Sequence, residues 1–371
     1  LMRSSAASDV YKRQALLLTG FGLGDSISAI MDNQFAEGGV CNYDVQIVLS
    51  DRYSLTDGRP EVMNNIENRS EIKSSMMTQM EVIDGTSDRT EDVLEINLLV
   101  PENSAALSEF VKLQNRQTGE KVTLGDDGVI ITEKFANQTD TKVGDNITII
   151  TADGKEVSVP VSGIVENYTF HYVYMSPALY EKTFGSEPSF NYVTAILNDN
   201  VDAAQKESLA TELMKVSGID AVAYTTQIID TFEQIISSLN LVVGIFILAA
   251  GALSFVVLYN LSNINLNERV REVATIKVLG FRDNEVSTYI VRENIILTII
   301  GTVLGLILGI FLHGYVVTVA EVDVVMFGRS IEPLSFVFAA ILSLVFAAIV
   351  NFIMHFKLKK VNMVESLKAV E

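Results

Sequence analysis

The sequence predicts a membrane protein that combines an α-helical transmembrane bundle with a mixed α+β extracytoplasmic domain. Its mean hydropathy is +0.31 although 20% of its 371 residues are charged, so apolar and polar residues must be separated along the chain. Three runs are long and apolar enough to span a bilayer. By contrast, residues 25–224 contain no such run, and their length of about 200 residues is enough for a domain with its own core.

The first 24 residues contain two different segments. Residues 1–14 match no element that follows, and the string from Ser4 to Gln14 resembles a translated sequencing-adapter remnant, so we expect a sequence artefact. A signal peptide is the alternative, but the apolar run from Ala15 to Thr19 is too short for its core. Residues 15–24 have the pattern of a transmembrane helix that ends near Gly24 and whose beginning is missing.

Residues 25–224 have the strand pattern of an α+β domain. Asp153 and Gly154 supply the positive φ angles of a tight hairpin, which predicts paired strands at residues 146–151 and 156–161. Pro160 cannot donate a ladder hydrogen bond, so it places the second strand at an edge or beside a bulge. Alternating apolar and polar residues predict further strands at residues 43–49, 93–100, 128–132 and 192–197.

Two helices are expected in the same domain. Ser176 followed by Pro177 is a helix N-cap with a first-turn proline, which predicts a short helix that ends at Gly185. A second helix is expected at residues 203–216, and a strand follows it at residues 221–224. The single cysteine, Cys41, cannot form an internal disulfide, so we expect a small core residue rather than a thiol that links two chains.

A single long helix is expected from Thr225 through Leu258. Residues 225–238 are polar enough for water, whereas residues 241–258 suit a membrane. A helix of about 35 residues is about 50 Å long at 1.5 Å per residue, which exceeds the apolar thickness of a bilayer. The excess would stand outside the membrane as a rigid stalk that can transmit movement mechanically.

Two further spans are expected at residues 295–312 and 334–350, and each carries small residues at every fourth position. Such stripes let membrane helices approach closely. Packing within this one chain and packing against a second subunit are equally compatible with the pattern. The small residues are Gly301, Gly305, Gly309, Ala339, Ser343 and Ala347.

Basic residues set the expected orientation. Five lysines and arginines fall between residues 269 and 292, and three more follow the last span at residues 357–360. The connection between the second and third complete spans offers only Arg329 among three carboxylates. Basic connections stay in the cytoplasm. We therefore expect a multi-pass plasma-membrane protein whose large domain faces outward and whose C-terminus is cytoplasmic.

The connection at residues 261–290 is the segment around which the chain is organised. Wound as a helix from Leu266 to Leu279, it is amphipathic, with apolar residues on one face and charges on the other. Ile276 and Leu279 fall on the charged face, where no lipid would cover them, and Gly280 suits a left-handed C-terminal cap. Apolar residues ringed by charges favour a docking surface for a soluble partner. An ordinary amphipathic helix on the membrane surface is the alternative.

The segment from Glu268 to Phe281 resembles the signature of FtsX-like ABC permeases, a family that includes the MacB and LolCE types. Met363 to Lys368 fits the same family, and residues 130–145 resemble the extracytoplasmic domain of MacB-like members. The resemblance runs from about Ala15 onward and implies the C-terminal module of a longer permease. It also implies that the connection is a coupling helix that docks on a cytoplasmic ATPase. The implied coupling residues are Glu268, Arg269, Arg271, Glu272, Thr275, Ile276, Lys277, Leu279 and Gly280.

The resemblance further implies a transport subunit rather than an enzyme. A separate ABC ATPase would hydrolyse ATP, and the outer domain would then move to export or extract an envelope substrate such as a lipoprotein, peptide or lipid. This chain would bind no cofactor, since ATP and Mg would sit in the ATPase, and its other partners would be a second permease half, from the same or a longer chain, and the bilayer. An FtsX-type regulator of a cell-wall hydrolase is one alternative, although its outer domain is much smaller. A membrane-anchored sensor or adhesin without an ATPase is another.

Several functions are disfavoured by what the sequence lacks. It has no Gly-x-x-x-x-Gly-Lys-Ser/Thr loop to cradle ATP phosphates, and its net charge of −19 argues against nucleic-acid binding. His171, His313 and His355 fall too far apart in the predicted topology to share a metal. The centres of the three complete spans carry no charge, which disfavours an ion-coupled carrier.

These expectations divide the chain into consecutive segments. Residues 1–14 are the artefact, 15–24 the truncated helix, 25–224 the extracytoplasmic domain and 225–260 the stalk with its span. Residues 261–290 are the cytoplasmic coupling segment, followed by a span at 291–318, an external loop at 319–332, a span at 333–356 and a cytoplasmic tail at 357–371.

Overall fold

The computed structural model describes residues 2–50 and 59–359, so the Met363 to Lys368 motif lies outside the described residues. The chain divides into two compact units. One unit, here called the helical unit, comprises Leu1–Ser28, Ile236–Glu321 and Phe327–Glu371. The other, here called the outer domain, comprises Ala29–Ile235 and Val322–Met326.

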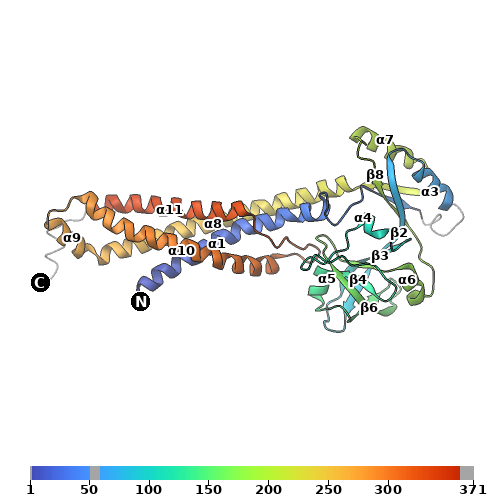
Figure 1. Cartoon of the computed structure of the whole chain (residues 1–371), viewed down its shortest axis with the longest axis horizontal. Coiled ribbons are helices and arrows are strands. Elements are labelled where there is room, and N and C mark those ends of the chain that lie inside the picture. Colours follow the sequence, from blue (N-terminus) through green and yellow to red (C-terminus); the bar gives the residue numbers. More distant parts are fainter. Residues whose placement is uncertain (1, 51–58, 360–371) are drawn as a thin grey trace. The chain divides into compact units, whose positions relative to one another are not determined.

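The outer domain is built on nine strands joined in one sheet, in the order β3-β7-β4-β6-β5-β2-β8-β1-β9 (Figure 1). β2 also pairs with β3, so β3, β7, β4, β6, β5 and β2 close into a ring, here called the barrel. The remaining strands, β8, β1 and β9, extend from the first half of β2. The strands are β1 Val45–Leu49, β2 Ile72–Ser87, β3 Leu94–Pro101, β4 Val129–Thr132, β5 Asn146–Ile150, β6 Glu156–Val165, β7 Tyr172–Tyr174, β8 Tyr192–Leu197 and β9 Ile219–Tyr224.

Two apolar cores follow from this division. One, inside the barrel, includes Ile96, Ile131 and Phe135, all fully buried. The second core lies between the β8-β1-β9 strands and two helices, α3 (Arg59–Glu67) and α7 (Ala203–Leu213). The strands β8, β1 and β9 together with α3 and α7 are here called the side lobe. β2 contributes to both cores because its residues 72–78 pair with β8 and its residues 84–87 pair with β5.

The predicted hairpin is present, and its second strand shows how Pro160 is accommodated. Residues 146–150 of β5 pair antiparallel with residues 156–160 of β6. β6 is no edge strand, because β4 pairs with its other side. The register between β4 and β6 shifts after Val129–Val161, which is the irregularity that the proline predicts. β2, β7, α3 and two short helices, α4 (Leu107–Phe110) and α5 (Glu133–Gln138), were not predicted.

Both predicted helices of the outer domain form. α6 (Pro177–Phe184) is capped by Ser176, whose side chain accepts a hydrogen bond from Leu179 N, and it ends at Gly185 with φ of 77°. α7 ends at Leu213, three residues before the predicted end. Cys41 is buried, and burial raises the pKa of its thiol to about 11, so the sulfur behaves as a core atom.

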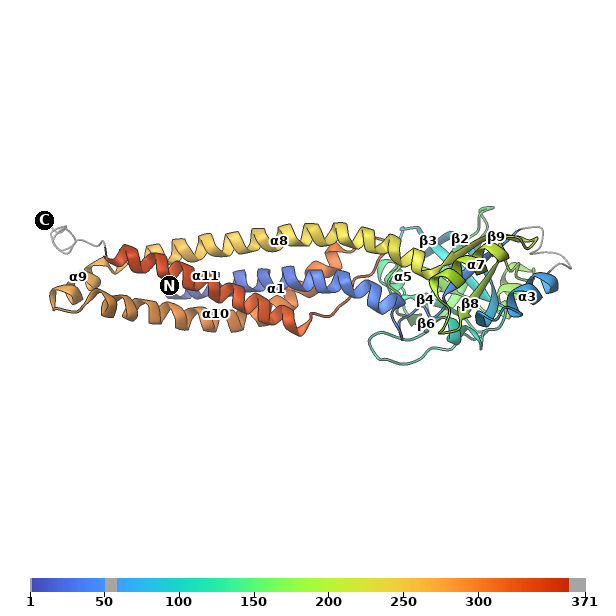
Figure 2. The same cartoon turned by 90° about the horizontal axis from the view of Figure 1, so that it is seen from above.

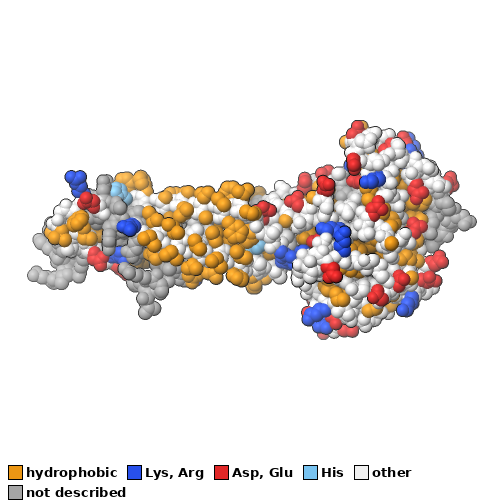
Figure 3. Space-filling model, in the orientation of Figure 1, with side chains coloured by type: hydrophobic (Ala, Val, Ile, Leu, Met, Phe, Trp, Pro, Cys, Tyr) orange, Lys and Arg blue, Asp and Glu red, His pale blue; other side chains and the backbone are white. Residues whose placement is uncertain are grey.

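The helical unit contains four long helices that run side by side (Figure 2). They are α1 (Met2–Phe35), α8 (Thr225–Glu268), α10 (Asp283–Ala320) and α11 (Pro333–Lys359), and a short helix, α9 (Val270–Val278), precedes α10. Within the described residues, these four have the length and hydropathy needed to cross a membrane. Apolar side chains cover much of the visible surface of the unit (Figure 3). Phe311, for example, is 73% exposed.

Two helix boundaries differ from the prediction. α1 does not end at Gly24 but continues to Phe35, since its glycines face neighbouring helices: a Cβ on Gly20 would lie 2.9 Å from Ile247. The boundary predicted between residues 24 and 25 therefore falls inside a helix. α8 extends ten residues beyond the predicted Leu258, to Glu268. The assignment of residues 1–14 as an artefact stays a prediction.

The small-residue stripes lie at helix contacts within this chain. A Cβ on Gly309 of α10 would approach Leu18 Cδ2 of α1 to 2.8 Å and Ala15 Cα to 3.3 Å. Ala339 of α11 is fully buried and packs in a cluster with Leu17, Leu18 and Ala250. In this chain, the small residues thus allow α1 to pack closely against α10 and α11. Gly301, Gly305, Ser343 and Ala347 are also buried.

Candidate coupling segment and outer-domain sites

The predicted coupling segment is two helices rather than one. α8 ends at Glu268, Arg269 forms a turn, and α9 begins at Val270. The backbone bridges the break, because Arg269 N donates to Leu266 O at 3.2 Å and Val273 N donates to Arg269 O at 2.9 Å. The prediction of one helix from Leu266 to Leu279 is therefore wrong at Arg269.

One face of α9 is packed into the helical unit. Val273 and Leu266 are buried in a cluster with Leu258, Val350 and Met354, and Ala274 is fully buried. Ile276 also packs against this cluster. Its expected exposure on the charged face is therefore wrong, because three residues after Val273 a helical side chain returns to the same face.

The end of α11 is fixed beside this cluster. Lys357 Nζ donates to Tyr259 Oη at 2.7 Å and to Asn263 Oδ1 at 3.1 Å, and it lies 4.7 Å from the centre of the Tyr259 ring. These contacts join α11 to α8 just before α9. α9 is therefore supported by packing and by polar bonds rather than standing as a free loop.

The opposite face of α9 and the turn after it are exposed and largely apolar. Leu279 is 72% exposed, Val278 62% and Phe281 54%. Gly280 has φ of 93°, the left-handed cap expected from the sequence, and this conformation favours glycine. Here Val278, Leu279 and Phe281 are called the apolar turn. The prediction included Leu279 but missed Val278 and Phe281.

Charged and polar residues flank the apolar turn. Glu268, Glu272 and Thr275 are exposed, and Arg269 is half-buried. The side chains of Arg271 and Lys277 lie outside the described residues. Behind the turn, Arg282 N donates to Glu285 Oε2 at 2.9 Å, which caps the start of α10. An exposed apolar knob with a charged rim has the composition of a protein-binding surface.

The histidines have separate structural surroundings. His313 of α10 bonds Ser26 Oγ at 2.9 Å and Gly22 O at 3.0 Å, which ties α10 to α1. A Cβ at position 22 would lie 2.7 Å from the His313 ring, so only glycine leaves room for this contact. His171 is buried in the outer domain beside Phe135, and burial lowers its pKa to about 4. The described residues contain no group of three metal-ligating side chains.

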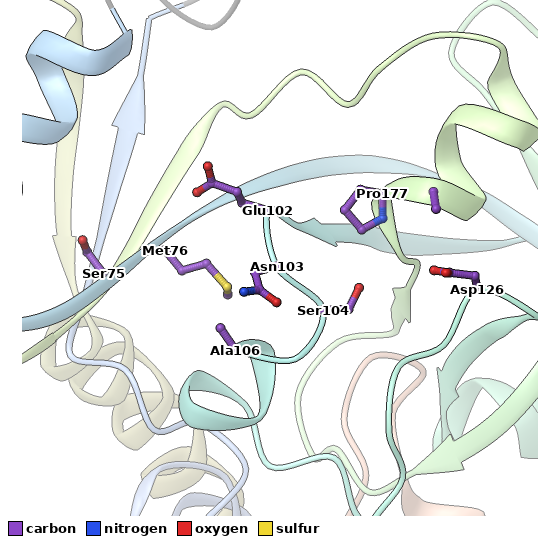
Figure 4. Close-up of a pocket in the computed structure, with 9 residues that line it drawn as sticks. Ser75, Met76, Glu102, Asn103, Ser104, Ala106, Asp126 and Pro177 are labelled. Atoms are coloured by element: carbon purple, nitrogen blue, oxygen red, sulfur yellow. The ribbon is translucent and has the colours of Figure 1, made fainter.

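The outer domain contains a polar cavity of about 630 Å³ beside the barrel (Figure 4). β2 contributes Ser75 and Met76, the segment after β3 contributes Glu102 to Ser104 and Ala106, and Asp126 and Pro177 complete the wall. The two carboxylates can accept hydrogen bonds from a polar or cationic group. Serine is the only nucleophilic residue type in the wall, and no histidine or lysine accompanies it, so the wall does not form a nucleophile–base pair.

Comparisons with known proteins match most of the chain. A family model of the MacB-like periplasmic core domain matches residues 15–213, and a model of the FtsX-like permease C-terminal region matches residues 244–363. No curated protein sequence matches the chain.

Two solved structures are similar to the outer domain at low identity. The periplasmic region of MacB from Actinobacillus actinomycetemcomitans is 13% identical, with a TM-score of 0.33 over 52% of this chain and 94% of that one. The extracellular domain of YknZ, a noncanonic ABC-type transporter from Gram-positive bacteria, is 16% identical, with a TM-score of 0.31 over 49% of this chain and 98% of that one.

Proposed function

Because this chain belongs to the FtsX-like ABC permeases that carry a MacB-like periplasmic core domain, we propose that it transmits the work of a separate cytoplasmic ATPase to its outer domain. ATP and Mg bind to the ATPase, and the chain itself is the transport subunit. A second permease half, from the same or a longer chain, completes the membrane complex. The substrate is an envelope lipoprotein, peptide or lipid.

The observation that carries this proposal is the apolar turn with its charged rim. Leu279, at 72% exposure, stands in a connection between two candidate spans and follows a helix whose other face is packed. Lipid does not cover the charged rim, so the surface suits a soluble protein partner. Apolar residues at the centre supply most of the binding free energy, whereas the rim charges set orientation and association rate.

The path from this surface to the outer domain runs back through α9 and the turn at Arg269 and then along one continuous helix, α8. α8 runs from Thr225 to Glu268 without a break, and its 44 residues extend about 65 Å at 1.5 Å per residue. The apolar core of a bilayer is about 30 Å thick, so α8 is long enough to act as span and stalk together. β9 ends at Tyr224, directly before α8, so displacement of the helix acts on the sheet without an intervening loop.

The proposed orientation places α9 and the C-terminus in the cytoplasm. Five basic residues between positions 269 and 292 support it, as do the three carboxylates and single arginine of the connection after α10. The outer domain would then face outward. Its size and its match to the MacB-like core favour a transporter over a cell-wall hydrolase regulator.

A photoreactive amino acid at Leu279 tests docking and orientation together. In cells that also express the partner ABC ATPase, we expect ultraviolet light to crosslink position 279 to that ATPase. Position Phe311 is the matched control, because it is apolar and equally exposed at 73% but lies in a candidate span. Absence of the crosslink at 279, or equal crosslinking from 311, would contradict the proposal.

A further inference from the structure

The connection between α10 and α11 has its two ends fixed within the helical unit. Glu321 accepts hydrogen bonds from Phe327 N at 3.0 Å, and its carboxylate lies 2.7 Å from the Arg329 guanidinium. Gly328 N donates to Ser26 O at 2.8 Å, and Glu332 N donates to Asp25 Oδ2 at 2.9 Å. These hydrogen bonds therefore hold the two ends of the connection to α1 and α10.

The middle of the same connection forms part of the outer domain. Val325 pairs antiparallel with Thr169, and the pair is flanked by two hydrogen bonds. Phe170 N donates to Val324 O at 2.7 Å, and Met326 N donates to Tyr168 O at 3.0 Å. Met326 is 1% exposed, so this short ladder is shielded from water.

The end of α1 holds the same short segment. Gln34 Nε2 donates to Asn167 Oδ1 at 3.0 Å, and Tyr168 N donates to Gln34 Oε1 at 2.9 Å. Gln34 is 5% exposed and Asn167 1%, so both bonds are buried. Losing one partner would leave a buried polar group unsatisfied, which destabilises the native structure.

α8 reaches the segment through aromatic rings. Phe170 packs edge-on against Phe232 of α8, with ring centres 5.9 Å apart, and Phe35 of α1 lies 6.3 Å from the same ring. Phe170 has φ of 59°, a left-handed conformation that is unfavourable for a residue other than glycine. Asn167 Nδ2 donates to Phe170 O at 3.1 Å and helps to hold this strained conformation.

The contacts of Asn167 to Phe170 all lie within the outer domain, and their partners are close in sequence to positions where the chain passes between its two units. The crossings follow Ser28 in α1, Ile235 in α8, and Glu321 and Met326 in the α10–α11 connection. We propose that Asn167 to Phe170, here called the joint, is where all of these segments grip the barrel of the outer domain. This inference rests on the proposed function in one respect, namely that ATP hydrolysis by the partner ATPase drives the movement.

The joint supplies an attachment that the covalent chain does not. β1 follows α1 and β9 precedes α8, so the side lobe is connected to both helices directly. No barrel strand adjoins a long helix in sequence. The joint runs directly into β7, which pairs with β3 and β4 of the barrel. Through the joint, the barrel is attached to these segments in addition to its links through β2, through the connection from α6 to β8, and through the pairing of Cys41 with Val111.

A disulfide tests whether the joint exists in the membrane protein. Thr169 and Val325 form a pair without direct hydrogen bonds, whose Cα atoms are about 4.5 Å apart, within the range that a disulfide bridges. In a Cys41→Ser background, Thr169→Cys with Val325→Cys is expected to oxidise readily, whereas Ser186→Cys with Val325→Cys is not. Failure of the first pair to oxidise would overturn the proposal. The two cysteine substitutions leave the backbone hydrogen bonds on either side of the pair in place, so they should not disturb the joint themselves.

Spin labels test whether the joint holds the barrel. With labels at Lys155 on the barrel hairpin and Glu233 on α8, both exposed, the full-length Cys41→Ser chain is expected to give one narrow distance distribution. Met326→Pro removes the N–H that bonds Tyr168 and should broaden it, whereas Met326→Ala keeps that donor and should not. No broadening, or equal broadening in both variants, would overturn the joint. Neither readout needs the ATPase, so a failure of the proposed function leaves these results unchanged.

Discussion

Three glycines inserted after Glu233 are expected to abolish ATP-driven movement of the outer domain while the bound ATPase continues to hydrolyse ATP. Glu233 lies in α8, between the packed helical unit and β9. Each glycine costs a helix about 1 kcal/mol relative to alanine and frees the backbone, so three glycines at one point make a flexible link. ATPase docking at α9 lies at the opposite end of the helix and should survive.

A dye that senses its environment, attached at Ser186→Cys in a Cys41→Ser background, reports the movement. The matched control is an insertion of three alanines, which changes the length and rotation of α8 by the same amount but keeps it stiff. We expect the alanine variant to retain a nucleotide-dependent signal. If the glycine variant keeps the full signal, α8 is only a tether, and equal loss in both variants would assign the effect to helix register rather than stiffness.

Reversal of two rim charges, Glu268→Lys with Glu272→Lys, is expected to prevent co-purification with the ATPase and leave membrane insertion intact. Both side chains are exposed and precede the apolar turn in sequence, so the change alters the surface without disturbing the packed face of α9. Like charges placed opposite each other at an interface cost several kcal/mol, and each 1.4 kcal/mol lowers affinity about tenfold. Arg271 is also expected among the coupling residues.

Glu187→Lys with Asp199→Lys is the control for this reversal. It changes the net charge by the same amount, but both residues are exposed positions of the outer domain. Co-purification measured against a fixed amount of membrane-inserted chain should fall only for the first pair. If the ATPase is recovered normally when the charges of Glu268 and Glu272 are both reversed, these charged residues do not take part in docking.

Elements set by local chemistry could be predicted from the sequence. Ser176 and Pro177 begin α6, and Gly185 ends it. The turn between β5 and β6 has the expected positive φ at Gly154, 79°, but not at Asp153. The three complete spans were also predicted, since about 20 apolar residues in a row suit few other structures. The left-handed conformation of Gly280 belongs with these, because no other residue ends a helix so readily.

Elements that depend on distant partners could not be predicted. β2 has no simple alternation because its two halves serve different cores, and it includes Gly85, where a Cβ would lie 2.9 Å from Ile96. Ile276 was misplaced because it follows Val273 by three residues and so shares the face that α9 packs against α8 and α11. The joint is invisible in sequence, since its bonds connect residues more than 130 positions apart, such as Gln34 with Asn167 and Tyr168.

The most direct test of coupling between the ATPase and the outer domain is the dye signal of a chain in which α8 and α9 are unchanged. The chain labelled at Ser186→Cys, in a Cys41→Ser background, is reconstituted in liposomes with and without its ATPase, and fluorescence is recorded on addition of MgATP. The account predicts a change that requires both the ATPase and ATP, because force enters at α9 and reaches the outer domain through α8. No change with the full complex, or the same change without the ATPase, would contradict it.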